Sequence, residues 1–238
     1  LAVGCGRSAE DWAAEGDRRL RSNDLVGAER AFNHALQREP HYGPACYGKG
    51  WALYASGHDD LRPAARQLFE RAIDYDPEYW GGYRGKAVLL LEEGKTAAAE
   101  RLLRTAWEKA PAEPTVLASL GQLYLANGRF EPAEKLFGAA LEASPERGEL
   151  HRYLADVRLA QGDYDGALDE LAVGLGSAVS GLRGLVLLQD GVIAVETKRA
   201  AEGLAAATGP ADPGLDTALQ ALDHADSVLD EARKAGIA

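Results

Sequence analysis

The chain has 238 residues, of which 46% are hydrophobic and 26% charged, a composition that suits a folded protein with a sizeable core. Its formal net charge of −11 at pH 7 argues against general binding to nucleic acid or to an anionic membrane surface, because both need clustered lysine and arginine. No apolar run approaches the roughly 18 residues that a membrane-spanning helix requires. Composition therefore predicts a neutral or basic partner, and no nucleic-acid ligand.

Prolines, small residues and bulky residues recur along the chain at a fixed spacing. Pro77, Pro111 and Pro145 lie 34 residues apart, and Pro40 precedes Pro77 by 37. Four other series follow the same rhythm: Ala28, Ala65, Ala99, Ala133 and Ala167; Phe32, Phe69, Leu103, Phe137 and Leu171; Ala35, Ala72, Ala106, Ala140 and Gly174; and Gly16, Gly50, Ala87, Gly121 and Ala155. A bulky residue between small ones on one helix face lets a neighbouring helix approach closely. The pattern predicts packed helices.

Each period divides into two halves of about 14 residues, which suits helices of three to four turns. The links between the halves carry residues that tolerate the left-handed backbone at a helix end: Asn23, Gly57, Gly94, Gly128 and Gly162. The recurring prolines fall near the end of the second half and prevent that helix from continuing. The 37-residue step places an insertion near residues 58–60, so a longer turn is expected there.

These features resemble the tetratricopeptide repeat, a helical hairpin of 34 residues with small, bulky and proline positions in this order. Residues 114–145 fill every expected position: Leu117, Leu120, Gly121, Tyr124, Ala133, Phe137, Ala140 and Pro145. The resemblance implies an all-α fold, a right-handed superhelical α-solenoid of about five hairpins followed by a C-terminal two-helix cap. The repeats are expected at residues 9–42, 43–79, 80–113, 114–147 and 148–179, after an N-terminal segment, 1–8.

The cap is expected at residues 180–238, with helices at about 181–207 and 213–234. A break at 208–213 separates them, because its glycine and prolines stop one helix and Asp212 suits the start of the next. The last helix would cover the open apolar end of the array. Its leucines and alanines alternate at spacings of three and four, so pairing with a partner helix is the alternative.

The sequence carries no strong motif for phosphate binding, metal binding or catalysis. Gly94-Lys95-Thr96 mimics the end of a phosphate-binding loop, but Leu89 stands where that loop needs glycine. The five histidines are scattered without metal-ligand spacing, and no catalytic constellation can be identified among the acidic residues. We therefore expect no enzyme activity, no cofactor and no metal site.

Function is expected where the first helices of the hairpins line the concave side of the array. The residues predicted to face this groove are Asp17, Tyr47, Trp51, Tyr54, Arg84, Gln122, Arg152, Tyr153 and Asp156. Tyrosine, tryptophan and arginine supply large contact areas and bidentate hydrogen bonds, so a protein or peptide ligand would bind there as a helix or an extended strand. For Trp51 and Tyr54 the alternative is packing between repeats.

One family subtype binds chaperone C-terminal carboxylates through lysine and asparagine. Here Ala13 and Tyr47 occupy the lysine positions, and Asp17 and Trp51 the asparagine positions, so that ligand is not expected.

The first six residues resemble the end of a bacterial lipoprotein signal, in which small residues precede an acylated Cys5. The sequence does not begin with Met and is expected to derive from a longer chain. A lipid on Cys5 would be the one link to a membrane and would place the array on its periplasmic side. An arbitrary start with a chance cysteine, in a cytoplasmic protein, is the alternative.

Two functions follow from these features. The first is a scaffold or adaptor that binds a partner polypeptide in its concave groove, tethered to a membrane as an assembly factor. The second is a structural subunit built permanently into a larger complex through its convex face or its last helix. Sequence alone predicts neither the identity of the partner nor the oligomeric state.

Overall fold

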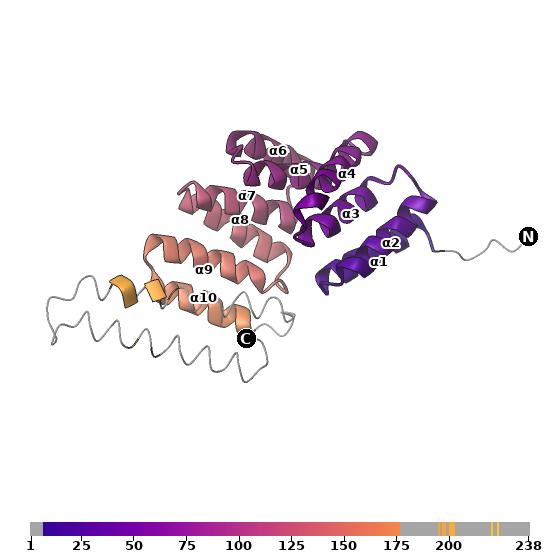
Figure 1. Ribbon diagram of the computed structural model, residues 1–238. Coiled ribbons are helices and arrows are strands. Elements are labelled where there is room, and N and C mark those ends of the chain that lie inside the picture. The colour runs from indigo at the N-terminus through magenta and orange to yellow at the C-terminus, as the bar shows by residue number, and fades with distance from the viewer. Residues whose placement is uncertain are drawn as a thin grey trace, which may run out of the picture. The chain divides into compact units, whose positions relative to one another are not determined.

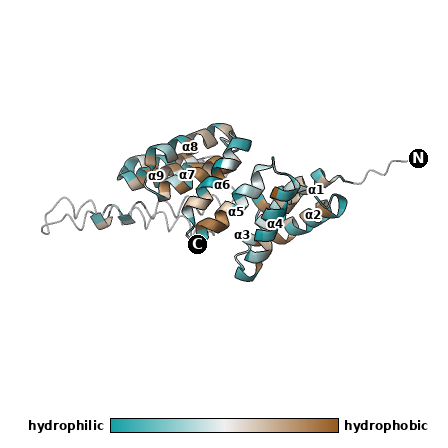
Figure 2. Cartoon of the chain, turned by 90° about the horizontal axis from the view of Figure 1, so that it is seen from above, coloured by the Kyte–Doolittle hydropathy of each residue, from teal (hydrophilic) through white to brown (hydrophobic). Residues whose placement is uncertain are grey.

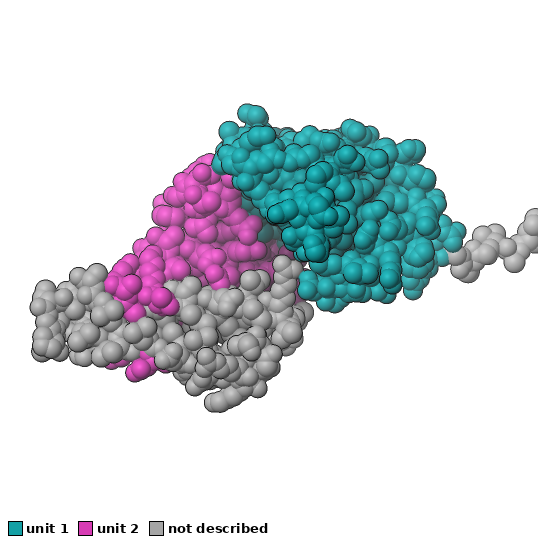
Figure 3. Space-filling model, viewed as in Figure 1, with its two compact units in different colours: residues 1–120 teal, residues 121–238 magenta. Residues whose placement is uncertain are grey.

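The computed structural model describes residues 7–176, together with residues 195, 197, 198, 200–202, 220 and 223. The predicted lipidation site Cys5 and most of the predicted cap at 180–238 lie outside these residues. The chain divides into two compact units, residues 1–120 and 121–238 (Figure 3).

Within the described residues the chain is helical, with no β-strand, which confirms the prediction of an all-α fold. The helices of the first unit are α1 (Ala9–Arg21), α2 (Leu25–Arg38), α3 (Gly43–Ala55), α4 (Arg62–Tyr75), α5 (Trp80–Glu92) and α6 (Thr96–Lys109). Helix α7 (Pro114–Ala126) begins in the first unit and ends in the second. The second unit continues with α8 (Phe130–Ala143), α9 (Glu149–Gln161) and α10 (Tyr164–Gly176).

The backbone at the links follows the predicted pattern. Asn23 has a φ of 59°, and the four link glycines have φ values of 69° to 81°, so each first helix ends in a left-handed residue. Each second helix from α2 to α8 ends two residues before a recurring proline. A short 3₁₀ helix, η1 (Asp59–Leu61), lies at the predicted insertion, before α4.

The hairpins of the first unit pair α1 with α2, α3 with α4 and α5 with α6 (Figure 1). Each second helix also packs against the first helix of the next hairpin, as α2 does on α3 and α4 on α5. In the second unit α9 packs against both α8 and α10. The helices carry hydrophobic and hydrophilic residues on different sides, as such packing requires (Figure 2).

Bulky side chains of the second helices fill the space between the layers. Phe32, Phe69 and Phe137 are completely buried. A glycine of the preceding helix faces each ring: a Cβ atom added to Gly16, Gly50 or Gly121 would lie 2.6 to 2.8 Å from ring carbons of Phe32, Phe69 or Phe137, respectively. Where the bulky residue is instead Leu103 or Leu171, the facing series has Ala87 or Ala155. The two positions thus match in size.

Candidate partner-binding face

Five of the nine residues predicted to face the groove lie in the first unit, on α1, α3 and α5. They are Asp17, Tyr47, Trp51, Tyr54 and Arg84. Helix α3 contacts both α1 and α5 directly, so consecutive first helices form a layer of their own. We call the surface that carries these five residues the first-helix face.

Aromatic rings occupy the centre of the first-helix face. The Tyr47 ring centroid lies 6.3 Å from that of Trp51, 5.8 Å from that of Tyr79 and 5.4 Å from that of Trp80. Trp51 in turn contacts Tyr54 at 5.1 Å. All five rings are partly exposed. The three rings of α3 also pack on the apolar core formed by α4 and α5, so each has a packed side and an accessible side.

Tyr79 and Trp80 were not predicted from the sequence. They stand at the start of α5, whereas the predicted positions were counted only within the helices. The available signal was an aromatic pair in a link that otherwise consists of charged residues and proline.

Arg84 connects three successive first helices. Its Nε donates a hydrogen bond to Ser119 Oγ on α7 at 2.9 Å, and its Nη1 donates one to Tyr47 Oη on α3 at 2.7 Å. Its guanidinium carbon lies 4.3 Å from the centre of the Trp51 ring, a cation–π contact. Only 9% of the residue is exposed. Ser119, whose own hydroxyl bonds to the carbonyl of Thr115, is a further residue that sequence reasoning missed.

Asp17 lies on α1 with its side chain exposed. Desolvation by surrounding protein nevertheless raises the pKa of its carboxyl, while the nearby charge of Arg21 opposes the shift. Desolvation at this position therefore favours the neutral form of the carboxyl.

Tyr54 lies at the edge of the first-helix face, where it joins a polar network. Its hydroxyl donates a hydrogen bond to Glu92 Oε1 at 2.8 Å, and Glu92 also pairs with Arg62. Burial, followed by the hydrogen bond to the Glu92 carboxylate, raises the pKa of Tyr54 to about 12. The hydroxyl therefore stays protonated and continues to donate at physiological pH.

The other four predicted residues lie in the second unit. Gln122 is exposed on α7, and Arg152 Nε donates to Asp156 Oδ1 at 2.9 Å along α9. Burial raises the pKa of Asp156, and its bond with Arg152 opposes the shift. Tyr153 stacks on the buried Phe137 with ring centroids 5.3 Å apart, so its ring takes part in packing.

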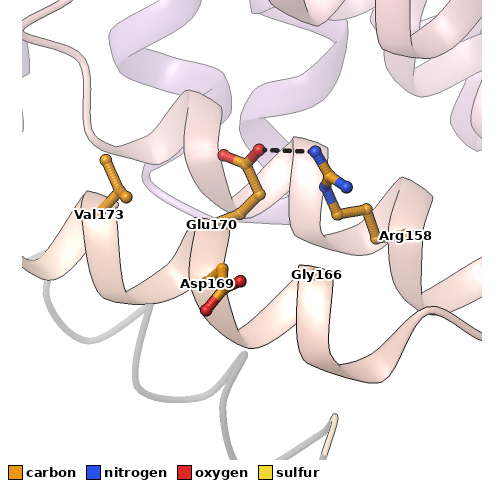
Figure 4. Close-up of a pocket in the computed structure, with 5 residues that line it drawn as sticks. All are labelled: Arg158, Gly166, Asp169, Glu170 and Val173. Carbon is orange, nitrogen blue, oxygen red and sulfur yellow. Dashed lines mark hydrogen bonds and ion pairs between the residues drawn. The ribbon is translucent and has the colours of Figure 1, made fainter.

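A small hollow lies between α9 and α10 (Figure 4). Its volume is about 150 Å³, and its lining consists of Arg158, Gly166, Asp169, Glu170 and Val173. Arg158 Nη2 donates to Glu170 Oε1 at 3.1 Å across it, and His151 Nδ1 lies 2.9 Å from the other carboxylate oxygen. Its volume is below the roughly 300 Å³ at which small-molecule sites begin, so this hollow is not a substrate pocket.

Neither a metal site nor a membrane-spanning helix is found in the part of the chain that the structure describes. No group of histidine, cysteine, aspartate and glutamate there is arranged to hold a metal ion. None of its helices is long and apolar enough to cross a membrane. The single cysteine among these residues, Cys46, is buried, and burial raises the pKa of its thiol.

Comparison with protein-family models gives matches over the second to fifth hairpins. Two models, both described as tetratricopeptide repeat, match residues 63–123 and 90–139 in one case and residues 119–181 in the other. Together they span residues 63–181, half of the 238-residue chain. No curated protein sequence matches significantly.

Solved structures with a similar fold include TTC0263, a thermophilic TPR protein of Thermus thermophilus. The match has a TM-score of 0.65 and 21% identity and covers 78% of this chain and 99% of that one. The Cut9–Hcn1 hetero-tetramer of APC/C matches with a TM-score of 0.63 and 20% identity over 90% of this chain and 43% of that one. PilF of Pseudomonas aeruginosa matches with a TM-score of 0.53 and 17% identity over 87% of this chain and 95% of that one. At these identities the likeness shows a shared fold.

Proposed function

The chain belongs to the tetratricopeptide-repeat family, whose members act as protein-interaction scaffolds, and from this premise we propose that its first-helix face binds a segment of a partner polypeptide. The proposal concerns where the partner binds and what chemistry holds it.

The observation that carries the proposal is the composition of the first-helix face. Five aromatic rings and one buried arginine lie together on α3 and α5. Tryptophan, tyrosine and arginine dominate the binding energy of protein interfaces, because they supply large contact area at little conformational cost. The rings are already packed against the core and against one another, so a partner would meet side chains that are largely ordered before binding.

The face also offers hydrogen-bond donors that the fold does not use. Among the described residues no hydrogen bond is made by Trp51 Nε1, Trp80 Nε1 or Tyr79 Oη, and none of these atoms is fully buried. An extended peptide presents backbone carbonyls to such donors. The first-helix face therefore suits a peptide segment better than a small molecule.

The proposal has a second part, a lipid on Cys5. Gly4 and Ala2 precede Cys5 as small residues do in a lipoprotein signal, so we propose a lipid anchor that holds the array on the periplasmic side of a bacterial membrane as an assembly factor. Intact-mass measurement of the protein isolated from its host would show diacylglycerol on Cys5. An unmodified thiol would exclude the anchor and favour the cytoplasm.

A structural subunit docked through another surface is the alternative, and one observation favours it. Trp107 on α6, a second helix, is 43% exposed, which is unusual for a tryptophan without a partner. Trp51 and Trp107 are therefore a matched pair of probes, since the same substitution removes the same side chain from a first helix and from a second helix.

The test uses a random peptide library displayed on phage and selected on the immobilised full chain. We expect wild type and Trp107→Ala to enrich the same peptides and Trp51→Ala to lose them, with folding of each variant checked by circular dichroism. Enrichment that survives Trp51→Ala and disappears with Trp107→Ala would move the binding site to the second helices. A wild-type chain that enriches no peptide would refute peptide binding at the first-helix face.

A further inference from the structure

Arg84 is a buried cation that has no anionic partner among the described residues. Several less buried arginines of the described hairpins pair with carboxylates, as Arg62 does with Glu92, Arg66 with Glu93 and Arg152 with Asp156. Arg84 is more buried than these, yet it forms no ion pair with any residue in the described ranges. Its hydrogen-bond acceptors are the neutral hydroxyls of Ser119 and Tyr47.

A buried charge is costly unless an opposite charge or several hydrogen bonds compensate it. At Arg84 the fold supplies two hydroxyl acceptors and the face of the Trp51 ring, and each of these interacts less strongly with a cation than a carboxylate does. The site is therefore only partly compensated by the protein itself. An incoming carboxylate would meet a guanidinium that is already desolvated and held in place on three sides.

A part of the guanidinium still reaches solvent. Two of its five N–H bonds are used, and Nη2 has no hydrogen-bond partner in the described chain. Nη2 is also not among the fully buried unpaired atoms, so it remains in contact with solvent despite the burial of the residue. Three N–H bonds are thus free, enough for both oxygens of a carboxylate.

The charges around this part of the guanidinium limit what kind of anion fits. The negative charges of Asp17 and Glu113 act on Tyr47 and Tyr79, whose pKa values are raised mainly by burial and further by these two carboxylates. A partner segment with a run of acidic residues would meet this negative field along the first-helix face. A single acidic residue would instead pair with Arg84. Neutral residues before and after it would not be repelled by the negative field, and basic ones would be attracted to it.

We propose that Arg84, with the Trp51 ring beside it, binds the side-chain carboxylate of one aspartate or glutamate within the partner segment. The proposal rests on the function proposed above and names the chemistry of that partner. A side chain is favoured over a terminal carboxylate because unused donors lie on two helices, with Trp51 Nε1 on the neighbouring helix α3 and Trp80 Nε1 at the start of α5, the helix of Arg84 itself. A chain that continues past Arg84 can reach both.

The test uses peptides selected on the full wild-type chain from a library fused to phage at the peptide C-terminus. No library member then carries a free terminal carboxylate. We expect the enriched peptides to share one acidic position flanked by neutral or basic residues. The best peptide is then made as a C-terminal amide in two forms, with the acid and with its amide (Asp→Asn or Glu→Gln), and its Kd is measured by fluorescence anisotropy.

We expect the amide form to bind wild type at least about tenfold more weakly, the loss typical of one charge-assisted hydrogen-bonded pair. In Arg84→Gln the two forms should bind equally, whereas the control Arg101→Gln, at an exposed position of the second helix α6, should keep the full difference. Equal affinity of both forms for wild type, or an acid preference that persists in Arg84→Gln, would overturn the proposal. The proposal would also be overturned if the peptide bound tightly only with a free C-terminal carboxylate in place of the C-terminal amide.

Failure of the inference can be told apart from failure of the proposed function. Peptides that are enriched on the first-helix face without a shared acid refute the role of Arg84 and leave peptide binding intact. A wild-type chain that enriches nothing refutes both. If circular dichroism shows that Arg84→Gln does not fold, the comparison of acid and amide peptides on wild type decides by itself.

Discussion

The size match between the small and bulky series makes a quantitative prediction at Gly121. Replacing Gly121 by alanine places a Cβ atom 2.6 Å from Phe137 Cε1, well inside the roughly 3.5 to 4.0 Å at which carbon atoms attract. Phe137 is completely buried, so its ring cannot turn away into solvent. Overpacking of this kind costs about 1–3 kcal/mol, against a helix-propensity gain of about 1 kcal/mol for Gly→Ala. We expect Gly121→Ala to lower the free energy of unfolding by up to about 2 kcal/mol.

The same pair predicts a rescue. Phe137→Leu alone leaves a cavity beside Gly121 and should cost about 1–2 kcal/mol. The double variant recreates the alanine–leucine combination that the chain has at Ala155 and Leu171, which lie in one buried cluster. The added methyl group then fills part of the space that the ring vacated. The double variant should be more stable than the sum of the single changes by about 1–2 kcal/mol, a coupling expected of residues in direct contact.

The measurement is urea unfolding of the four proteins, followed by far-UV circular dichroism, which reports secondary structure. Gly138→Ala is the matched control, because Gly138 lies in α8 next to Phe137 and a Cβ atom there would meet nothing within 4 Å. That substitution should raise stability by about 1 kcal/mol through helix propensity alone. Additive effects of Gly121→Ala and Phe137→Leu, or a Gly121→Ala variant as stable as Gly138→Ala, would refute the size-matching argument.

Three further predictions concern the links and the first-helix face. Gly128→Ala should lower the free energy of urea unfolding by about 1 kcal/mol, because Gly128 has a left-handed φ of 69°. Asn23→Gly, at a φ of 59°, should leave that free energy unchanged or raise it. Equal effects of the two substitutions would contradict the backbone explanation. The pKa of Tyr54 is about 12 in the folded protein, against an ordinary value of 10.0. The protonated hydroxyl should therefore stabilise the fold fully below pH 10, and this stabilisation should be lost as the pH rises toward 12. Tyr54→Phe should weaken this alkaline loss, and an unchanged urea midpoint profile between about pH 9 and 12 would count against the hydrogen bond to Glu92. Desolvation raises the pKa of Asp17, so ionisation of its carboxyl opposes folding. Asp17→Asn should therefore raise the urea midpoint at about pH 7 and leave it unchanged at a pH well below the ordinary pKa of aspartate. A lower midpoint of the variant at neutral pH would contradict this explanation.

Much of the fold could be predicted because its determinants are local and repeated. The left-handed residues Asn23 and Gly162 and the prolines after α2, α4, α6 and α8 act within a few positions of the helix end that they define. The inserted residues near Asp59 appear as a break in an otherwise fixed period, and the structure places a 3₁₀ helix there. Such signals are visible in one sequence without knowing which helices touch.

The first-helix face was only partly predictable because its contacts join residues that are distant in sequence. Arg84 and Tyr47 stand 37 positions apart, at equivalent positions of consecutive repeats, but the repeat pattern predicts neither the hydrogen bond between them nor the one to Ser119, 35 positions away. Tyr79 and Trp80 stand at the start of a helix, outside the positions that helical periodicity assigns to a face. Trp51 was predicted either to face the groove or to pack between repeats, and its ring packs on the core while remaining partly exposed. The structure shows that the two alternatives are compatible.

The repeats also act as internal replicas that separate packing from binding. Positions in the hairpin core keep their size from one repeat to the next, as Ala28, Ala65 and Ala99 do, because a neighbouring helix lies against each of them. Equivalent positions on the first helices vary freely instead: Asp17, Trp51, Val88, Gln122 and Asp156. A position that packing restricted to one size would not carry this range of charge and size. We therefore expect the chain to change its partner there without changing its fold, and a substitution at the exposed Gln122 should leave the urea midpoint nearly unchanged.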